Sequence, residues 1–246
     1  MRTPARNWKY GQTDVNVLLL AVIWRGVAIP LLYELLPHGG GSHTEIRHTL
    51  MDDALCLLSV ADIRVLYADR EFVGYNWIQG LACLGIPICV RLRSDTLMDD
   101  WTAKDWLSRL QTGTAGLLVE DTLVYGQPMN VVLTHTRDGE ALIIASNAGA
   151  VTTIQKRYRR RFLIETGQHD YGDTSRTFCV FIIEVALSIH RWWYRAPTGP
   201  ALKAWSRRTS ASSAQRHQLP PRFDCLPFTT PRRSHVYNVT AGISSA

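Results

Sequence analysis

The clearest indication of fold class in this 246-residue chain is the segment IRVLYADREFVGYNWIQGLACLGIPICVRLR, residues 63–93. It begins with a short apolar run that predicts a buried strand, and the charged triplet Asp-Arg-Glu follows at the carboxyl end of that strand. Residues 75–84 suit a helix, and a Gly-x-Pro turn then introduces a second strand over residues 88–92. Strand, helix and strand in succession are typical of an α/β protein.

Upstream of this segment the sequence predicts a β-hairpin followed by a helix. Residues 14–24 and 27–36 are apolar and β-rich, and a two-residue Arg-Gly turn joins them. We expect Ser42 to cap a helix that runs to about residue 60, with Glu45 as its capping-box partner. The α/β pattern therefore extends across the first part of the chain.

Downstream of residue 93 the predicted elements become shorter and more polar. We expect a helix over 101–110, antiparallel strands over 116–124, 130–136 and 140–146, a helix over 152–165, and a helix or strand over 180–189. The resulting regions are the first part of the core (1–93), a β-rich insertion (94–150), a C-terminal core helix region (151–195), and an Arg, Ser and Pro-rich tail (196–246) that is expected to be disordered.

Composition and charge narrow the class of protein. Hydrophobic residues are 46% of the chain and charged residues 20%, which excludes wholesale disorder. The net charge of +6 is uneven, because residues 1–150 carry −4 and residues 151–246 carry +10. Nearly all the basic residues are arginines, whose planar guanidinium suits contacts with phosphate. Codon bias in a GC-rich genome is the alternative explanation for the arginine content.

The cysteines and the absence of long apolar stretches indicate the cellular compartment of the protein. The five cysteines show no Cys-x-x-Cys spacing, and most of them lie in apolar runs. We therefore expect reduced core cysteines in a reducing cytosol, with neither a disulfide framework nor a zinc site. Residues 1–14 contain no apolar signal sequence, and no apolar stretch of about 20 residues predicts a membrane-spanning helix. The expected location is the cytoplasm, with no membrane partner.

Two acidic residues are the candidates for chemistry. Asp69 follows the predicted strand at its carboxyl end, where a carboxylate at a sheet edge is well placed to hold a metal ion. Glu165 lies on a predicted helix with Tyr158 and Arg161 on the same face. The alternatives are a solvated acid at a strand end for Asp69 and a surface pair with Arg161 for Glu165. Trp77 lies near the same strand, and we expect it to be a core aromatic residue.

Three motifs in order resemble one family of enzymes. YADREFVGYNWIQGL (67–81) followed by GIPICVRLR (85–93) resembles the second-aspartate region of DDE transposases of the insertion-sequence-four type. Residues 7–50, which begin NWKYGQTD, are similar to the stretch after the first catalytic aspartate of that family. YRRRFLIE (158–165) resembles its Tyr-x2-Arg-x3-Glu signature. The resemblance covers roughly residues 7–165.

The resemblance implies an RNase H-like mixed sheet with flanking helices and a β-rich insertion before the Glu. It also implies Mg²⁺ (or Mn²⁺), which two-metal transposases use to cleave and rejoin DNA by in-line displacement. Asp69 and Glu165 would then be catalytic residues and metal ligands. Transposon-end DNA would be the partner, bound by a homo-oligomer. The implied DNA-binding residues are Tyr158 and Arg161, which position phosphate near the Glu, and Arg157, Arg159 and Arg160.

The sequence departs from the family at two places. The position of the first catalytic Asp holds Pro4, or Met1 in another alignment, and most of that central first strand is missing; Asp14 is a weaker substitute ligand. The signature should continue to a Lys where Gly172 stands, and the tail resembles translation in a shifted frame. We therefore expect a truncated, inactive transposase remnant. An active transposase and an unrelated, non-enzymatic Arg-rich nucleic-acid-binding protein are the alternatives.

Overall fold

The structure is a computed structural model that describes residues 8–10, 13–24, 26–36, 41–110, 114–136, 138–162, 178–185 and 235–240. The strands are β1 (Trp8–Tyr10), β2 (Thr13–Trp24), β3 (Val27–Leu36), β4 (Ile63–Ala68), β5 (Ile88–Arg91), β6 (Leu97–Met98), β7 (Trp101–Thr102), β8 (Thr114–Val124), β9 (Gln127–His135), β10 (Ala141–Ser146), β11 (Phe178–Val185) and β12 (His235–Thr240). The helices are α1 (Thr44–Leu55), α2 (Tyr75–Cys83), α3 (Ala103–Ser108) and α4 (Ile154–Tyr158), with 3-10 turns η1 (Val60–Asp62), η2 (Val151–Thr153) and η3 (Arg159–Phe162).

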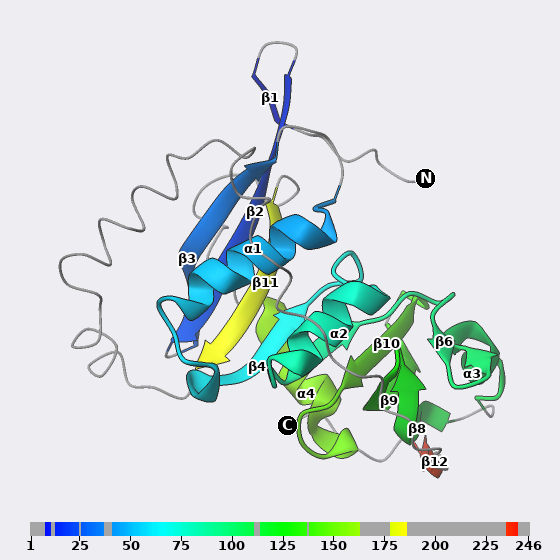
Figure 1. The fold of residues 1–246 in the computed structure, drawn as a ribbon. Coiled ribbons are helices and arrows are strands. Elements are labelled where there is room, and N and C mark those ends of the chain that lie inside the picture. Colours follow the sequence, from blue (N-terminus) through cyan, green and yellow to red (C-terminus); the bar gives the residue numbers. More distant parts are fainter. Residues whose placement is uncertain are drawn as a thin grey trace.

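The fold is mixed α/β and is organised around one large mixed sheet (Figure 1). The strand order is β1-β2-β11-β4-β5-β10-β9-β8-β6-β7, with β3 paired to β2 and β12 paired to β8. Pairs β4–β5 and β2–β11 are parallel, whereas the strands of the β-rich insertion are antiparallel. Because β10 pairs with β5, strands β8–β10 belong to the same sheet as β4 and β5.

The N-terminal hairpin matches the sequence prediction. Strands β2 and β3 pair antiparallel from Asn16 opposite Leu36 to Trp24 opposite Val27. Gly26 in the turn has a φ of +81°, a left-handed conformation that glycine adopts without steric strain. The strands predicted around Asp69 and in the insertion, and the helix that became α2, also form within a few residues of their expected bounds.

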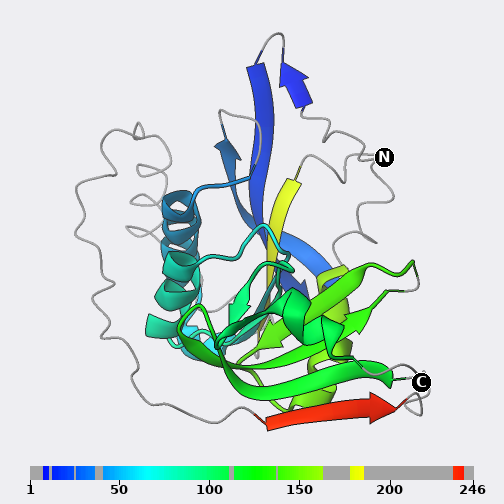
Figure 2. The ribbon, with the colours of Figure 1, turned by 90° about the vertical axis from the view of Figure 1, so that its right-hand side faces the viewer.

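Helices cover both faces of the sheet (Figure 2). Alternate residues of a strand face opposite sides, so Leu66 and Tyr67 of β4 belong to two different buried clusters. Leu66 packs in the cluster beneath α1 and α2, where Trp77 is fully buried, as expected of a core aromatic residue. Tyr67 packs in the cluster beneath α4, together with Tyr158. The second face is the one that carries the candidate site.

Strand β11 lies in the middle of the sheet, between β2 and β4 (Figure 1). It runs parallel to β2, with Phe178 opposite Val17, and antiparallel to β4, with Phe181 opposite Ala68. The sequence of β11, FCVFIIEV, is almost entirely apolar. This suits a central strand, because both faces of such a strand are covered by the protein. A segment more than 100 residues from β4 in the chain therefore joins the N-terminal hairpin to the rest of the sheet.

Two helix predictions need correction. Helix α1 begins at Thr44 with His43 at its N-cap, and it ends at Leu55. Ser42 does not cap it, because the Ser42 hydroxyl accepts a hydrogen bond from Nε of buried Arg47 at 2.8 Å. The helix expected over 152–165 consists of η2, α4 and η3, and residues 163–165 lie outside the described part.

Two further expectations are wrong in part. Residues 235–240 of the tail that was predicted to be disordered form β12, which pairs antiparallel with β8; the rest of the tail lies outside the described residues. Cys56 and Cys89 carry free thiols, but Cys83 is disulfide-bonded to a partner that is not among the described side chains. In the part of the chain that the structure describes, no helix has the length and apolar character needed to cross a membrane.

Candidate functional site

Asp69 lies where strand β4 leaves the sheet. The last four residues of β4 are buried, and the chain turns immediately after Ala68. In this turn the carboxylate Oδ1 accepts a hydrogen bond from the backbone N–H of Arg70 at 2.7 Å, and the carbonyl of Asp69 accepts one from Phe72 at 2.9 Å. The Asp69 side chain remains 30% exposed. A negative charge is thus fixed at the carboxyl end of a buried strand.

Tyr158 and Arg161, which lie much further along the chain, contact this carboxylate. The Tyr158 hydroxyl lies 3.4 Å from Oδ1 of Asp69, a long hydrogen bond across 89 residues of sequence. Nη1 of Arg161 lies 3.8 Å from Oδ2, and its guanidinium carbon lies 5.8 Å from the centroid of the Tyr158 ring. Burial raises the pKa of Tyr158, and the charge of Asp69 raises it further, so the hydroxyl stays protonated and donates to the carboxylate.

The pairing of β10 with β5 brings these residues together. Strand β10 returns beside β5, with Ser146 opposite Cys89. The Ser146 hydroxyl donates to the carbonyl of Ile88 at 2.7 Å, and the side-chain oxygen of Asn147 accepts from the N–H of Ile88 at 2.7 Å. These bonds fix the end of β10 at the start of β5, so that α4 begins over the face that carries Tyr67. Tyr158 then reaches Asp69.

A second carboxylate on the same face was not singled out by the sequence. Glu184 of β11 accepts a hydrogen bond from the Tyr67 hydroxyl at 2.7 Å and another from Nη1 of Arg160. Nη1 of Arg64 lies 4.0 Å from the same carboxylate, whose side chain is 13% exposed. The only signal in the sequence is a lone acid inside the apolar run FCVFIIEV. Two consecutive arginines of η3 thus contact two acids. Arg160 pairs with Glu184 on β11, and Arg161 pairs with Asp69 just after the neighbouring strand β4.

The other two arginines assigned to DNA differ in their surroundings. Nη1 of Arg157 donates to the carbonyl of Ala148 at 3.0 Å, and its guanidinium packs against Gly149, where a Cβ would lie 2.7 Å from Nη2. Arg159 is exposed. Of the five predicted DNA-binding residues, the structure therefore places Arg159 and Arg160 on the surface and Tyr158 in the core.

The described residues alone do not make a magnesium site. Among them, no group of three or more His, Cys, Asp or Glu side chains is close enough to share a metal ion. Glu165, Pro4 and Met1 lie outside the described residues, so the shared metal-ligand role of Asp69 and Glu165 remains a prediction. Within the described part, the groups facing Asp69 are a guanidinium and a hydroxyl, neither of which is a ligand that Mg²⁺ prefers.

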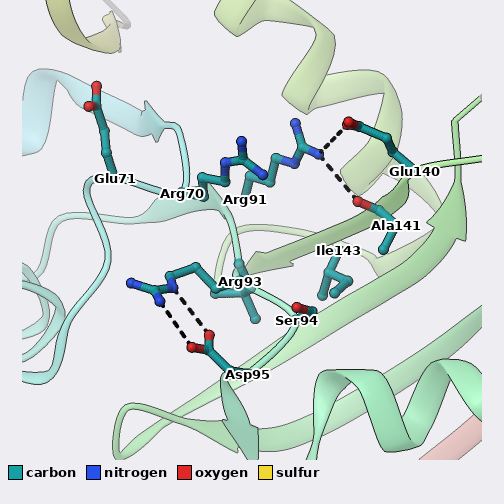
Figure 3. A pocket seen from close by; sticks show the side chains of 10 residues that line it. Arg70, Glu71, Arg91, Arg93, Ser94, Asp95, Glu140, Ala141 and Ile143 are labelled. Carbon is teal, nitrogen blue, oxygen red and sulfur yellow. Dashed lines mark hydrogen bonds and ion pairs between the residues drawn. The ribbon is translucent and has the colours of Figure 1, made fainter. Parts of the chain in front are cut away.

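A cavity of about 590 Å³ is lined by Arg70 and Glu71, the two residues that follow Asp69 in the chain, and by residues of β5 and β10 (Figure 3). Arg93 forms two hydrogen bonds with Asp95, at 3.2 and 3.0 Å. Arg91 donates to a backbone carbonyl at 3.2 Å and lies 3.6 Å from the carboxylate of Glu140. No carboxylate of the described residues lies within ion-pair distance of Arg70. The charged residues that line the cavity are Arg70, Glu71, Arg91, Arg93, Asp95 and Glu140.

Comparison with known proteins finds no family model that matches the chain and no curated protein that matches it. The assignment of a function therefore depends on the motifs of the sequence and on the geometry of the Asp69 site.

Proposed function

We propose that this chain is a transposase-like DNA-binding protein of the DDE, insertion-sequence-four type that no longer cleaves DNA. One observation carries the proposal. The Tyr and Arg of the 158–165 motif meet the aspartate of the 67–81 motif, with contacts of 3.4 and 3.8 Å, although 89 residues separate Asp69 from Tyr158. The convergence on one side chain of two motifs that act together in the family supports the resemblance.

The charge and chemistry of the site support binding of a phosphodiester chain. Residues 151–246 carry a net charge of +10, and segment 156–161 alone contains Lys156 and four arginines. A guanidinium can donate two parallel hydrogen bonds to phosphate, which makes arginine the preferred side chain for this contact. Asp69 contacts Arg161 of this segment, and its negative charge repels a phosphate group unless a cation lies between them. DNA is therefore expected to contact the exposed arginines and to avoid Asp69.

The lack of cleavage follows from the acids that the site contains. Two-metal displacement needs carboxylates that bridge and hold both ions. The family position of the first Asp holds Pro4 or Met1, neither of which has a carboxylate. Among the described residues, Asp69, the second acid, belongs to no group of three side chains that could hold a metal ion.

Strand β11 is part of the same proposal. An RNase H-like core is expected to have its first strand at the centre of the sheet. We propose that β11 holds this central position here, between β2 and the strand that carries Asp69. The carboxylate of β11 is bonded to Arg160 and Tyr67, so Glu184 does not replace the missing metal ligand.

Salt-dependent DNA binding tests the proposal. The full chain should bind a short duplex of arbitrary sequence at low salt, and the logarithm of the binding constant should fall linearly with the logarithm of salt concentration. Arg159→Gln should reduce that slope by about 0.9, the value for one phosphate contact. Arg109→Gln is the matched control, because Arg109 is also exposed but stacks 3.9 Å over Trp101 in the insertion. Absence of binding, or equal effects of both variants, contradicts the proposal.

The alternative is an Arg-rich nucleic-acid-binding protein unrelated to transposases, which the uneven charge favours. Both candidates predict salt-dependent binding, so the DNA around the gene must distinguish them. Terminal inverted repeats flanking the reading frame support the transposase origin, and their absence together with unrelated neighbouring genes supports the alternative.

A further inference from the structure

Strand β11 places a carboxylate against the basic segment, which we define as residues 156–161. Nη1 of Arg160 donates to Oε1 of Glu184, and the Tyr67 hydroxyl donates to Oε2 at 2.7 Å. Arg64 adds a third cationic or donor group at 4.0 Å. With its side chain 13% exposed, Glu184 is held on three sides, while the Arg160 side chain is 48% exposed and turns its head inward to meet it.

The Glu184–Arg160 pair is ionised at neutral pH. Burial alone would raise the pKa of the Glu184 carboxyl, but the hydrogen bonds from Arg160 and Tyr67 outweigh burial and lower the pKa. Glu184 thus offsets the charge that half-exposed Arg160 presents at the surface. A phosphate that binds Arg160 competes with Glu184 for this guanidinium, and taking it over completely would leave the largely buried carboxylate without its strongest partner.

We infer that Glu184 is an autoinhibitory contact that withholds Arg160 from polyanions such as DNA. Strand β11 thereby weakens DNA binding by the basic segment below what its charge allows. The inference rests on the proposed DNA binding and adds its regulation. Removal of the carboxylate by substitution frees Arg160 to act as an additional phosphate contact.

Glu184→Gln in the full chain tests this inference. Glutamine keeps the shape and the ability to accept a hydrogen bond from Tyr67, but it removes the charge that holds Arg160. The salt slope of duplex binding should steepen by about 0.9, which corresponds to a gain of about eightfold in affinity at 0.1 M salt relative to 1 M. Glu184→Asp withdraws the carboxylate by one methylene and should give a smaller gain of the same sign, which provides a second test if the Gln variant does not fold.

Two controls separate this effect from a general change of charge. Asp100→Asn removes the same charge from an exposed acid in the β6–β7 turn, and it should leave the slope unchanged. Adding Arg160→Gln to Glu184→Gln should abolish the gain. A gain that persists in the double variant, or an equal gain from Asp100→Asn, overturns the inference. Failure of the wild-type chain to bind at about 50 mM salt overturns the proposed function itself, so the two failures are distinct.

Discussion

At the scale of single residues, the two free thiols that the structure describes have opposite environments. Cys56 is exposed after α1, whereas Cys89 is fully buried in β5. Burial raises the pKa of the Cys89 thiol to about 12, well above the usual value near 9. Because the thiolate is the reactive form, Cys89 should remain unreactive until the pH approaches 12 or the chain unfolds.

Alkylation of the native chain with iodoacetamide at about pH 8.5 should therefore modify exposed Cys56 much faster than Cys89, because Cys89 is buried and its raised pKa keeps it protonated at that pH. Peptide mapping by mass spectrometry measures both rates in one sample. In denaturant the two rates should converge. Equal rates under native conditions would show that β5 is not buried in the sheet.

Among the elements, the contact between α1 and α2 depends on a missing side chain. A Cβ on Gly80 would lie 2.7 Å from Nε2 of His48, and the His48 ring is stacked on Trp77 with centroids 5.2 Å apart. Gly80→Ala should lower the free energy of unfolding by about 1–2 kcal/mol, because the clash outweighs the gain in helix propensity. Gly41→Ala, with no atom within 4 Å of the added Cβ, should change it by less than about 1 kcal/mol. Urea denaturation measures both, and a stabilised Gly80→Ala variant would contradict this packing.

The central position of β11 makes a separate prediction. Ile183 is fully buried, and its replacement by alanine should cost about 2–5 kcal/mol, with Ile183→Val costing about 0.5–1.5 kcal/mol. Ile29 on β3 is 40% exposed, so Ile29→Ala should cost less than about 1 kcal/mol. The measurement is the free energy of unfolding in urea. Similar small costs at both positions would mean that β11 does not contribute to the core.

The difference between β11 and the other elements shows what the sequence can predict. The hairpin, β4, α2 and β8–β10 each have a local pattern of apolar residues and turns, and their predicted bounds agree with the structure within a few residues. Pairing of β11 with β2 and β4 joins segments more than 100 residues apart, and no local pattern encodes it. The candidate site divides in the same way. Asp69 follows from its place after a strand, whereas Glu184 becomes visible only when β11 is in the sheet.

In the molecule as a whole, the sheet places arginine side chains beside the carboxylates, and it does not gather the described carboxylates into one cluster. On the face beneath α4, Arg161 lies beside Asp69 and Arg160 bonds Glu184, while the described residues contain no cluster of three metal-ligating side chains. Each carboxylate is thus balanced by a cation that belongs to the protein. Among the described residues this face therefore presents ion pairs and no cluster of carboxylates that could share two divalent ions.

We therefore predict that this 246-residue chain neither nicks nor joins DNA in the presence of Mg²⁺ or Mn²⁺. Losing one of three metal-bridging carboxylates displaces an ion that must align the reaction, and an error of about 1 Å already costs on the order of 100-fold in rate. The assay is nicking of supercoiled DNA that carries the two ends of the transposable element encoding this chain. Asp69→Ala is the control for metal-dependent activity at this site. Robust nicking that Asp69→Ala abolishes would prove the prediction wrong and would require a further acid beside Asp69, outside the residues that the structure describes.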